Sequence, residues 1–462
     1  MKKAPPQRGA FLFTDTLPRA KNEYLSTVNQ PLNDPKTIRA WCMYDWANSV
    51  YSLVITSTIF PIYYQAVTTT ETSGDVVSFF GFPIVNSVLY SYSLSLSFLL
   101  IAPFLPLLSG IADYTGNKKP FMKAFVYLGG LSCIGLFFFT GENVEWGILC
   151  SMLASIGYAG SVVFYDAYLP EIATEDQVDR VSARGYSMGY YGSVLLLVAN
   201  LATMTYWKQL GFPDEGTSVR FSFLLVGIWW IGFSQITFRR LPDNPFNQRP
   251  TGRVLFNGYR ELKKVWLSLA EYPNLKRYLG AYFFFNMGVQ TVMYLAATFG
   301  SKELNLDANK LIITVLIIQL VASFGAHLFA NLSKRKGNKY SLTTMILIWI
   351  FFCVMAYLTT NEYEFYALAT LVGMVMGGIQ SLSRATYSKL LPENSIDHAS
   401  YFSFFDITFS VSIVLGTFSY GLIEHITGSM RNSTLALMIF FIIGLALLSR
   451  VTVSNRPKEQ VA

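Results

Sequence analysis

Twelve apolar stretches, each long enough to cross a lipid bilayer as a helix, constrain this chain of 462 residues more than any other feature. A bilayer core of roughly 30 Å needs about 20 apolar residues per helix. Only 14% of the residues are charged, whereas soluble proteins carry about 25%. The sequence therefore predicts an all-α, multi-pass membrane protein with twelve transmembrane helices. We expect these spans at about 40–67, 86–111, 120–140, 145–169, 181–207, 219–239, 274–300, 310–332, 340–360, 363–390, 399–426 and 431–451.

The basic side chains indicate how these spans are oriented. Lys and Arg concentrate on the cytoplasmic side of membrane proteins. Of the 35 Lys and Arg residues, 30 lie in segments on the side that both termini share, and five lie on the other side. We therefore expect both termini in the cytoplasm. The net charge of +7 then reflects orientation, and no nucleic-acid partner is expected.

A polar segment in the middle of the chain separates two six-helix halves. It begins with the Pro-rich run LPDNPFNQRPTG and continues with apolar residues at helical spacing among basic ones. That pattern favours a helix lying on the inner membrane surface, with a solvated linker helix as the alternative. The expected parts are a cytoplasmic tail (1–39), a six-helix bundle (40–240), this cytoplasmic linker (241–272), a second bundle (273–452) and a cytoplasmic tail (453–462).

The two halves repeat each other weakly. Gly-Asn-Lys triplets begin at Gly116 and Gly337, after the second span of each half. Leu-Pro-Glu triplets begin at Leu169 and Leu391, after the fourth span of each half. Parallel six-helix repeats with a substrate site between them, near the middle of the membrane, are the architecture of major facilitator transporters.

The stretch SGIADYTGNKK (109–119) resembles the loop between the second and third helices of that superfamily, although Ser109 and Asn117 depart from its pattern. The residues that match are Asp113, Gly116, Lys118 and Lys119.

Longer stretches resemble one family within the superfamily, the vacuolar amino-acid effluxers linked to autophagy and their bacterial relatives. They are YDWANSVYSLVITSTIFPIYY (44–64), YDAYLPEIATEDQVDRVSARGYSMGYYGS (165–193), GGIQSLSRATYSKLLPE (377–393) and FNMGVQTVMYLAATFG (285–300). The resemblance covers nearly all of residues 40–450. It implies a transporter, and its vacuolar members imply amino-acid efflux.

A polar stripe in the first span indicates the wall of an internal cavity. At 100° per residue, five polar side chains fall on one narrow face of this helix. They are Asp45, Asn48, Ser49, Ser52 and Thr56. Lipid contact explains such a stripe poorly, because polar groups are costly in hydrocarbon. Asp45 could also serve as a gate or as a charge at the helix N-terminus.

Amides in the second half are expected to face this stripe across the cavity. Asn286 and Gln290 lie four residues apart on the seventh span, and Gln380 lies on the tenth. Amides both donate and accept hydrogen bonds, which suits a zwitterionic or polar solute. Hydrogen bonds between helices are the alternative. The predicted substrate-binding residues are thus Asp45, Asn48, Ser52, Thr56, Asn286, Gln290 and Gln380.

Charged residues near the cytoplasmic ends of the spans are expected to gate the cavity. The tight turn from Asp113 to Lys119 can lock the halves together in one state and release them in another. Asp166 and Glu171 are close in sequence to Arg180 and Arg184 and are expected to pair with them. The predicted gating residues are Asp113, Gly116, Lys118, Lys119, Asp166, Arg184, Arg384 and Asp406.

Arg384 and Asp406 are expected at similar depth on the tenth and eleventh spans. Our hypothesis is an Arg384–Asp406 ion pair that opens during the transport cycle. Arg384 could instead clamp a substrate carboxylate or extend to the membrane surface.

These features predict a transporter that works by alternating access, not an enzyme. The sequence has no ATP-binding loop of the Gly-x-x-x-x-Gly-Lys-Ser/Thr type, so uphill transport would draw on an ion gradient. Asp45 and Asp406 are the candidate proton acceptors, with the proton as coupling ion. No cofactor or metal is expected, since the four cysteines have neither metal-ligand nor disulfide spacing.

We expect export of a small polar solute such as an amino acid. The alternatives are import of another small metabolite and a non-transporting receptor of the same fold. The expected partners are this solute and the lipid bilayer, the expected oligomeric state is a monomer, and the expected location is a bacterial inner membrane.

Overall fold

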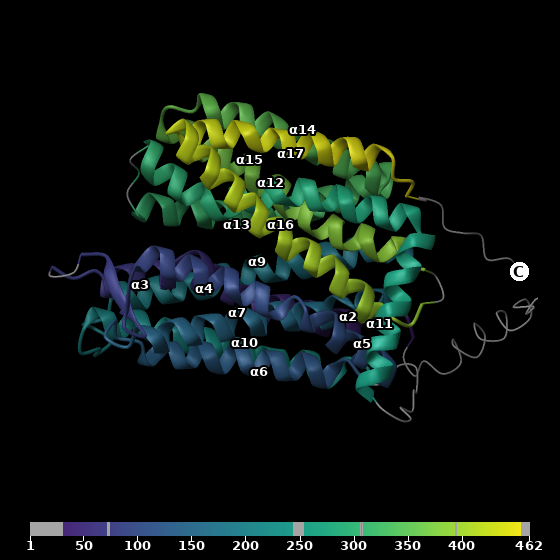
Figure 1. Ribbon diagram of the computed structural model, residues 1–462, viewed down its shortest axis with the longest axis horizontal. Helices are drawn as coiled ribbons and strands as arrows, with labels where there is room; N and C mark the ends of the chain where they lie inside the picture. The colour runs from purple at the N-terminus through teal and green to yellow at the C-terminus, as the bar shows by residue number, and fades with distance from the viewer. Residues whose placement is uncertain are drawn as a thin grey trace, which may run out of the picture.

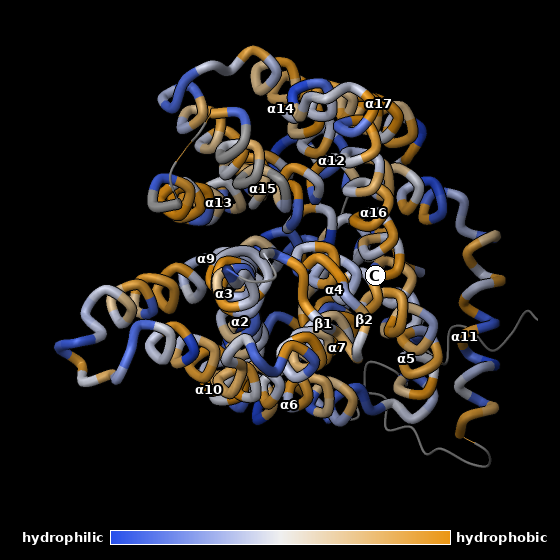
Figure 2. The backbone as a smooth tube through the Cα atoms, turned by 60° about the vertical axis from the view of Figure 1, so that its left-hand side comes forward, coloured by the Kyte–Doolittle hydropathy of each residue, from blue (hydrophilic) through white to orange (hydrophobic). Residues whose placement is uncertain are grey.

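The protein consists of two helical bundles that lie side by side (Figure 1). A computed structural model describes residues 31–71, 74–243, 254–304, 306, 308–392 and 395–453. Helices from the first half of the chain form one bundle and helices from the second half form the other, and the two groups are also separate in Figure 2. Residues 1–30 of the tail expected at 1–39, residues 454–462 of the tail expected at 453–462, and linker residues 244–253 lie outside the described residues.

Six apolar spans make up the first bundle. Their helices are α2 (Pro35–Val50), α3 (Ile59–Thr68), α4 (Asn86–Ile101), α5 (Phe104–Thr115), α6 (Lys119–Gly135), α7 (Val144–Asp166), α8 (Leu169–Ile172), α9 (Glu175–Thr205) and α10 (Glu215–Arg240). The span α6 ends in a 3₁₀ turn, Leu136–Phe138. Outward-facing apolar side chains such as Leu99, Leu131 and Leu195 are more than half exposed, as expected of a surface that lies in lipid.

The second bundle follows the same plan. Its helices are α12 (Pro273–Leu304), α13 (Ala308–Lys336), α14 (Asn338–Leu358), α15 (Glu362–Leu390), α16 (His398–Thr427) and α17 (Met430–Ser449). Over the part of the chain that the structure describes, eleven helices are long and apolar enough to cross a membrane. The remaining one, α12, has 32 residues and carries the amides Asn286 and Gln290 at its centre. The predicted all-α membrane fold is confirmed.

The first span is not the continuous α-helix that the sequence predicts. A π-helical segment, Tyr51–Ser57, lies between α2 and α3. The hydroxyls of Ser57 and Thr58 donate to the carbonyls of Ser52 (3.0 Å) and Leu53 (2.6 Å), five residues earlier. Because a π-turn holds more residues than an α-turn, it changes the face on which later side chains lie. The polar stripe therefore does not continue at 100° per residue beyond Val50.

Two further local features interrupt the expected pattern. The second span bends between α4 and α5 at Pro103, which has no N–H to give to the helix. The loop before α4 contains a short antiparallel hairpin, β1 (Val76–Phe79) and β2 (Phe82–Val85). Its two turn residues, Phe80 and Gly81, both have positive φ (49° and 85°), as a two-residue hairpin turn requires.

The linker forms α11 (Val254–Glu271), which runs across the ends of both bundles (Figure 1). We call this end of the molecule the α11 end and the opposite one the hairpin end. Lys264 pairs with Asp397 (3.0 Å) just before α16. On the other bundle, the Asn257 amide donates to the Tyr114 hydroxyl (2.8 Å). Apolar side chains on the outer face stay largely exposed, among them Leu255, Phe256, Tyr259 and Trp266. The expected position on a membrane surface stays a prediction.

Candidate functional site

Arg384 on α15 is the centre of a buried ion cluster that joins the two bundles. Its guanidinium donates to the Asp166 carboxylate (2.9 Å) and to the Asp45 carboxylate (3.3 Å). It also donates from Nε to the Ser182 hydroxyl (3.0 Å), and Tyr165 donates to Asp45 (2.7 Å). All five side chains come from buried residues. A planar guanidinium offers five N–H donors, so one arginine can hold two carboxylates and a hydroxyl at once.

Aromatic rings enclose the same guanidinium. It lies 4.3 Å from the centroid of the Tyr186 ring, 4.7 Å from that of Trp41 and 5.5 Å from that of Tyr165. The Trp41 and Tyr165 rings stack on each other at 4.4 Å. Such rings attract a cation through their electron-rich faces and exclude water from it. The cluster is therefore dry, charged and placed at the boundary between the bundles.

The sequence-based pairings of these charges are wrong. Arg384 pairs with Asp45 and Asp166 of the other bundle, not with Asp406. Asp166 therefore does not pair with Arg180 or Arg184. Proximity along the chain suggested those partners, but packing of α7, α9 and α15 decides the distances.

Close packing of α2 on α9 places Asp45 beside Arg384. A Cβ atom on Gly185 would lie 2.3 Å from Asp45 Oδ2 and 3.1 Å from Arg384 Nη2, and one on Gly189 would lie 2.3 Å from Ser49 Oγ. Glycine is thus the residue that allows this approach. Part of the polar stripe of the first span faces α9 for this reason.

Substituting Gly185 with alanine should displace Asp45 from Arg384. We expect a loss of about 1–3 kcal/mol of stability, the usual cost of overpacking, seen as a lower melting temperature of the purified protein. Gly232→Ala on α10 is the matched control, since nothing lies within 4 Å of its added Cβ. Equal melting temperatures for the two variants would show that Asp45 needs no such close approach.

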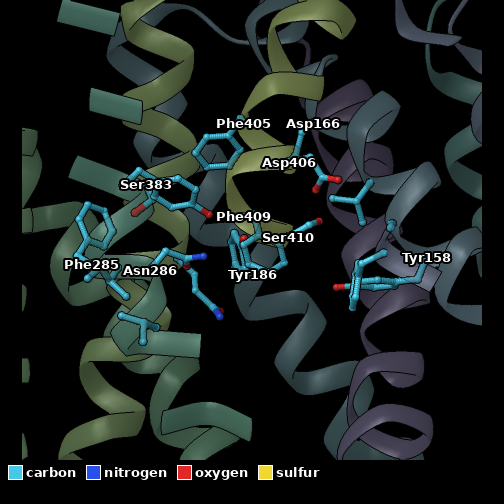
Figure 3. A pocket seen from close by; sticks show the side chains of 17 residues that line it. Tyr158, Asp166, Tyr186, Phe285, Asn286, Ser383, Phe405, Asp406, Phe409 and Ser410 are labelled. Carbon is cyan, nitrogen blue, oxygen red and sulfur yellow. The ribbon is translucent and has the colours of Figure 1, made fainter. Parts of the chain in front are cut away.

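A cavity lies directly beside the ion cluster, between the bundles (Figure 3). Helices α4, α7 and α9 of the first bundle and α12, α15 and α16 of the second contribute to its wall. Polar residues in the wall include Asp166, Tyr186, Asn286, Gln380, Asp406 and Ser410. Asp166 and Tyr186 belong to both the cavity wall and the Arg384 cluster, so the cluster closes the cavity toward the α11 end.

The predicted substrate-binding residues divide into two groups. Asn286 and Gln380 line the cavity, whereas Asp45, Asn48, Ser52, Thr56 and Gln290 lie outside its lining. No side chain of the polar stripe lines this cavity, contrary to the expectation for the first span. Asp45 and Ser49 instead pack against the glycines of α9, and from Tyr51 on the π-helical segment changes the face on which each side chain lies.

The two amides of α12 contact each other and α16 rather than the first span. The Gln290 side-chain amide donates to the side-chain oxygen of Asn286 (3.2 Å), and the Asn286 side chain donates to the Ser412 hydroxyl (2.6 Å). In contrast, Gln380 joins the bundles, since the Tyr190 hydroxyl of α9 donates to its side-chain oxygen (2.8 Å). Among these three amides, Gln380 is thus the one whose side-chain hydrogen bond crosses between the bundles.

The predicted gating turn lies at the bundle boundary. Asp113 accepts hydrogen bonds from the backbone N–H groups of Ala399 (3.1 Å) and Ser400 (2.7 Å), in the first turn of α16. It thereby caps a helix of the other bundle. Gly116 ends α5 in a left-handed conformation (φ 67°), which lets the chain turn sharply after Asp113.

Replacing Asp113 with alanine should loosen the α11 end. The loss of an N-cap typically costs about 1–2 kcal/mol, and here the cost falls on the state in which the bundles touch. We expect faster thiol labelling of a cysteine introduced at Ser403, which is buried in this state. Asp113→Asn, which keeps an acceptor oxygen, should label at an intermediate rate. Labelling at the wild-type rate in both variants would contradict the assignment.

A second contact between the bundles mirrors the first and was missed by sequence reasoning. Asp179, in the second turn of α9, accepts from Ser333 (2.9 Å), Asn338 (2.8 Å) and Lys389 (2.8 Å). Asn338 belongs to the Gly-Asn-Lys triplet that repeats the one at Gly116. The repeat itself was the signal. The turn at Gly116 contacts the start of α16 in the second bundle, so the corresponding turn at Gly337 should contact a helix near its start in the first bundle.

The remaining predicted gating residues separate in space. Lys118 is buried and pairs with Glu171, which also contacts His398 of the other bundle (2.9 Å). Glu171 therefore does not pair with Arg180 or Arg184 either. Lys119 pairs with Asp243 (2.7 Å) and Arg184 is exposed, whereas Asp406 faces the cavity.

Comparison with known proteins agrees with this architecture. The model of the family described as "Vacuole effluxer Atg22 like" matches residues 33–461. The uncharacterized MFS-type transporter YxiO of Bacillus subtilis is 30% identical over 90% of this chain and 95% of its own length. Autophagy-related protein 22-1 of Aspergillus terreus is 22% identical over 84% of this chain and 78% of its own.

Solved structures of major facilitator transporters share the fold. The transporter FucP matches with a TM-score of 0.68, at 10% identity over 91% of this chain and 99% of its own. The proton:xylose symporter XylE matches with a TM-score of 0.66, at 11% identity over 93% and 95%. The chain has two bundles with a cavity between them, and the family model matches nearly its whole length. It is a multi-pass membrane transporter of a small molecule, not an enzyme. It belongs to the Atg22-like vacuole effluxer family of major facilitator transporters.

Proposed function

We propose that this transporter exports a small polar solute, most simply an amino acid, by alternating access. The cavity between the bundles carries the proposal, because both halves contribute polar side chains to its wall. A solute bound there contacts both bundles, so a rocking motion of one bundle against the other changes the side from which it is reached. The effluxer family supports export as the direction.

The contacts at the α11 end form the gate on one side of this cavity. Asp113 with α16, Asp179 with Lys389, and Arg384 with Asp45 all cross between the bundles. The distribution of Lys and Arg favours a cytoplasmic location for this end. In this orientation the structure represents the state closed to the cytoplasm, and these contacts must separate when the solute enters from inside the cell.

A bacterial cytoplasmic membrane is the proposed location, and the proton is the proposed coupling ion. The Bacillus relative is more similar in sequence than the fungal one, which supports the location. Buried carboxylates at the cavity supply the groups that proton coupling needs. An imposed pH gradient across proteoliposomes should then drive amino-acid accumulation, and a collapsed gradient should abolish it.

Counterflow in proteoliposomes tests the function. Vesicles preloaded with a mixture of unlabelled amino acids are offered labelled ones singly. We expect uptake of at least one by the wild type, and loss of that uptake in Gln380→Ala. Gln209→Ala, at an exposed position, is the matched control and should transport normally. A folded wild type that takes up no amino acid would favour another metabolite or the receptor alternative.

A further inference from the structure

One carboxylate in the cavity wall lacks the partners that buried acids usually have. Asp406 on α16 is 9% exposed, and its Oδ2 atom is buried with no hydrogen-bond partner. A buried charge without a partner is costly, so such groups usually bind a counter-charge. Asp45 and Asp166, in contrast, are buried acids that each accept a hydrogen bond from Arg384.

The charges around the cavity do not balance. Arg384 carries one positive charge and is already shared by Asp45 and Asp166. Asp406 adds a third carboxylate, in the wall of the same cavity as Asp166. The described residues of the cavity wall include two acids, Asp166 and Asp406, and neither lysine nor arginine. With all three acids ionised, the site lacks two positive charges, which favours a cationic group over an anionic one.

Aromatic side chains line the same cavity wall as this unpartnered acid. Phe405 and Phe409 flank it on α16, and rings from α7, α9 and α12 complete the wall. The Tyr282 and Phe405 rings stack at 4.3 Å and hold each other in place. Ring faces attract ammonium groups, and a carboxylate among rings is the usual chemistry for recognising one.

We propose that Asp406 is the subsite for the ammonium group of the transported solute, with the aromatic wall holding an apolar body beside it. This inference rests on the proposed function and narrows its substrate class to compounds that carry an alkylammonium group. The carboxylate of an amino acid is then not the recognised end, because Arg384 already donates to Asp45, Asp166 and Ser182 in this state. An amine without a carboxylate should bind, whereas a carboxylate without an amine should not.

Three compounds that share one isobutyl group test this order. They are leucine, 3-methylbutylamine, which lacks the carboxylate, and 4-methylpentanoate, which lacks the amine. Binding to the purified full-length protein is measured as a ligand-dependent rise in melting temperature, since a ligand that binds only the folded state stabilises it. We expect the two ammonium compounds to bind at least about tenfold more tightly than 4-methylpentanoate, as for one charge-assisted hydrogen bond.

Variants of Asp406 assign the effect to this residue. Asp406→Asn should weaken both ammonium compounds by at least about tenfold, and Asp406→Glu, which keeps the charge, should restore part of the affinity. Asp75→Asn makes the same chemical change at an exposed position and should bind like the wild type. If Asp406→Asn fails to fold, Phe409→Leu, which removes one aromatic face beside the acid, should weaken the same two compounds and not 4-methylpentanoate.

The results distinguish this inference from the proposed function. Equal binding of leucine and 4-methylpentanoate, no binding of either ammonium compound, or unchanged leucine affinity in Asp406→Asn would each overturn the ammonium subsite. If Asp406→Asn keeps its leucine affinity but loses pH-driven accumulation, the ammonium subsite is overturned and Asp406 is a proton site instead. Failure of the proposed function is a different result: a wild type that binds the ammonium compounds but shows no counterflow of any amino acid.

Discussion

Replacing Arg384 with alanine is expected to give the largest loss of stability of any single substitution at the bundle boundary. The change leaves two buried carboxylates, Asp45 and Asp166, without their cation. Removing one partner of a buried ion pair typically costs about 3–5 kcal/mol, and here two acids lose the same partner. We expect a strongly reduced melting temperature and no counterflow. Scanning fluorimetry of the purified variant and transport in proteoliposomes measure the two effects.

Two further variants separate charge from packing. Arg184→Ala, an exposed arginine on α9, should change stability by no more than about 0.5 kcal/mol. In the triple variant Asp45→Asn, Asp166→Asn, Arg384→Gln the cluster is neutral, so much of the lost stability should return. Transport should stay impaired if the cluster must open and close during the cycle. A wild-type melting temperature for Arg384→Ala would show that the two acids do not depend on it.

Asp179→Ala is expected to be the second most damaging substitution. Three donors of the other bundle, on Ser333, Asn338 and Lys389, lose their acceptor, and Lys389 is nearly buried. We expect a loss of about 3–5 kcal/mol from the state closed at the α11 end. Since about 1.4 kcal/mol changes an equilibrium tenfold, the open state should become far more populated. Thiol labelling of a cysteine at Ser403 measures this shift.

The control for Asp179 lies one turn earlier on the same helix. Glu175→Ala removes an exposed acid from the first turn of α9 and should cost no more than about 1 kcal/mol, the usual size of a helix-dipole effect. The double variant Asp179→Ala, Lys389→Ala should be less damaging than the two single effects added together, because the residues interact directly. Strict additivity would mean that the ion pair contributes nothing to closure.

The class of protein, and several residues at the boundary between the bundles, could be predicted from resemblance and helical periodicity. Arg384 and Gln380 were predicted from polar positions within the tenth span, Asp113 from the loop motif and Asp166 from its place at the end of the fourth span, and all four lie between the bundles. The reason is general: a polar side chain in a bilayer must face protein or water. Which partner each one meets was not visible, and the Arg384–Asp406 pair failed for that reason.

The sequence by itself determined the helical spans and their orientation, since the length of apolar runs and the placement of basic residues depend on the bilayer and not on tertiary contacts. The transporter family followed from the resemblance of four longer stretches. Only the tertiary structure decided the site. The π-helical segment at Tyr51–Ser57 changed the faces on which the later residues of the polar stripe lie, and Gly185 let Asp45 reach Arg384. Arg384 pairs with Asp45 and Asp166, so Asp406 has no cationic partner among the described residues of the cavity wall. Partners separated by more than two hundred residues are brought together by helix packing, which no local pattern records.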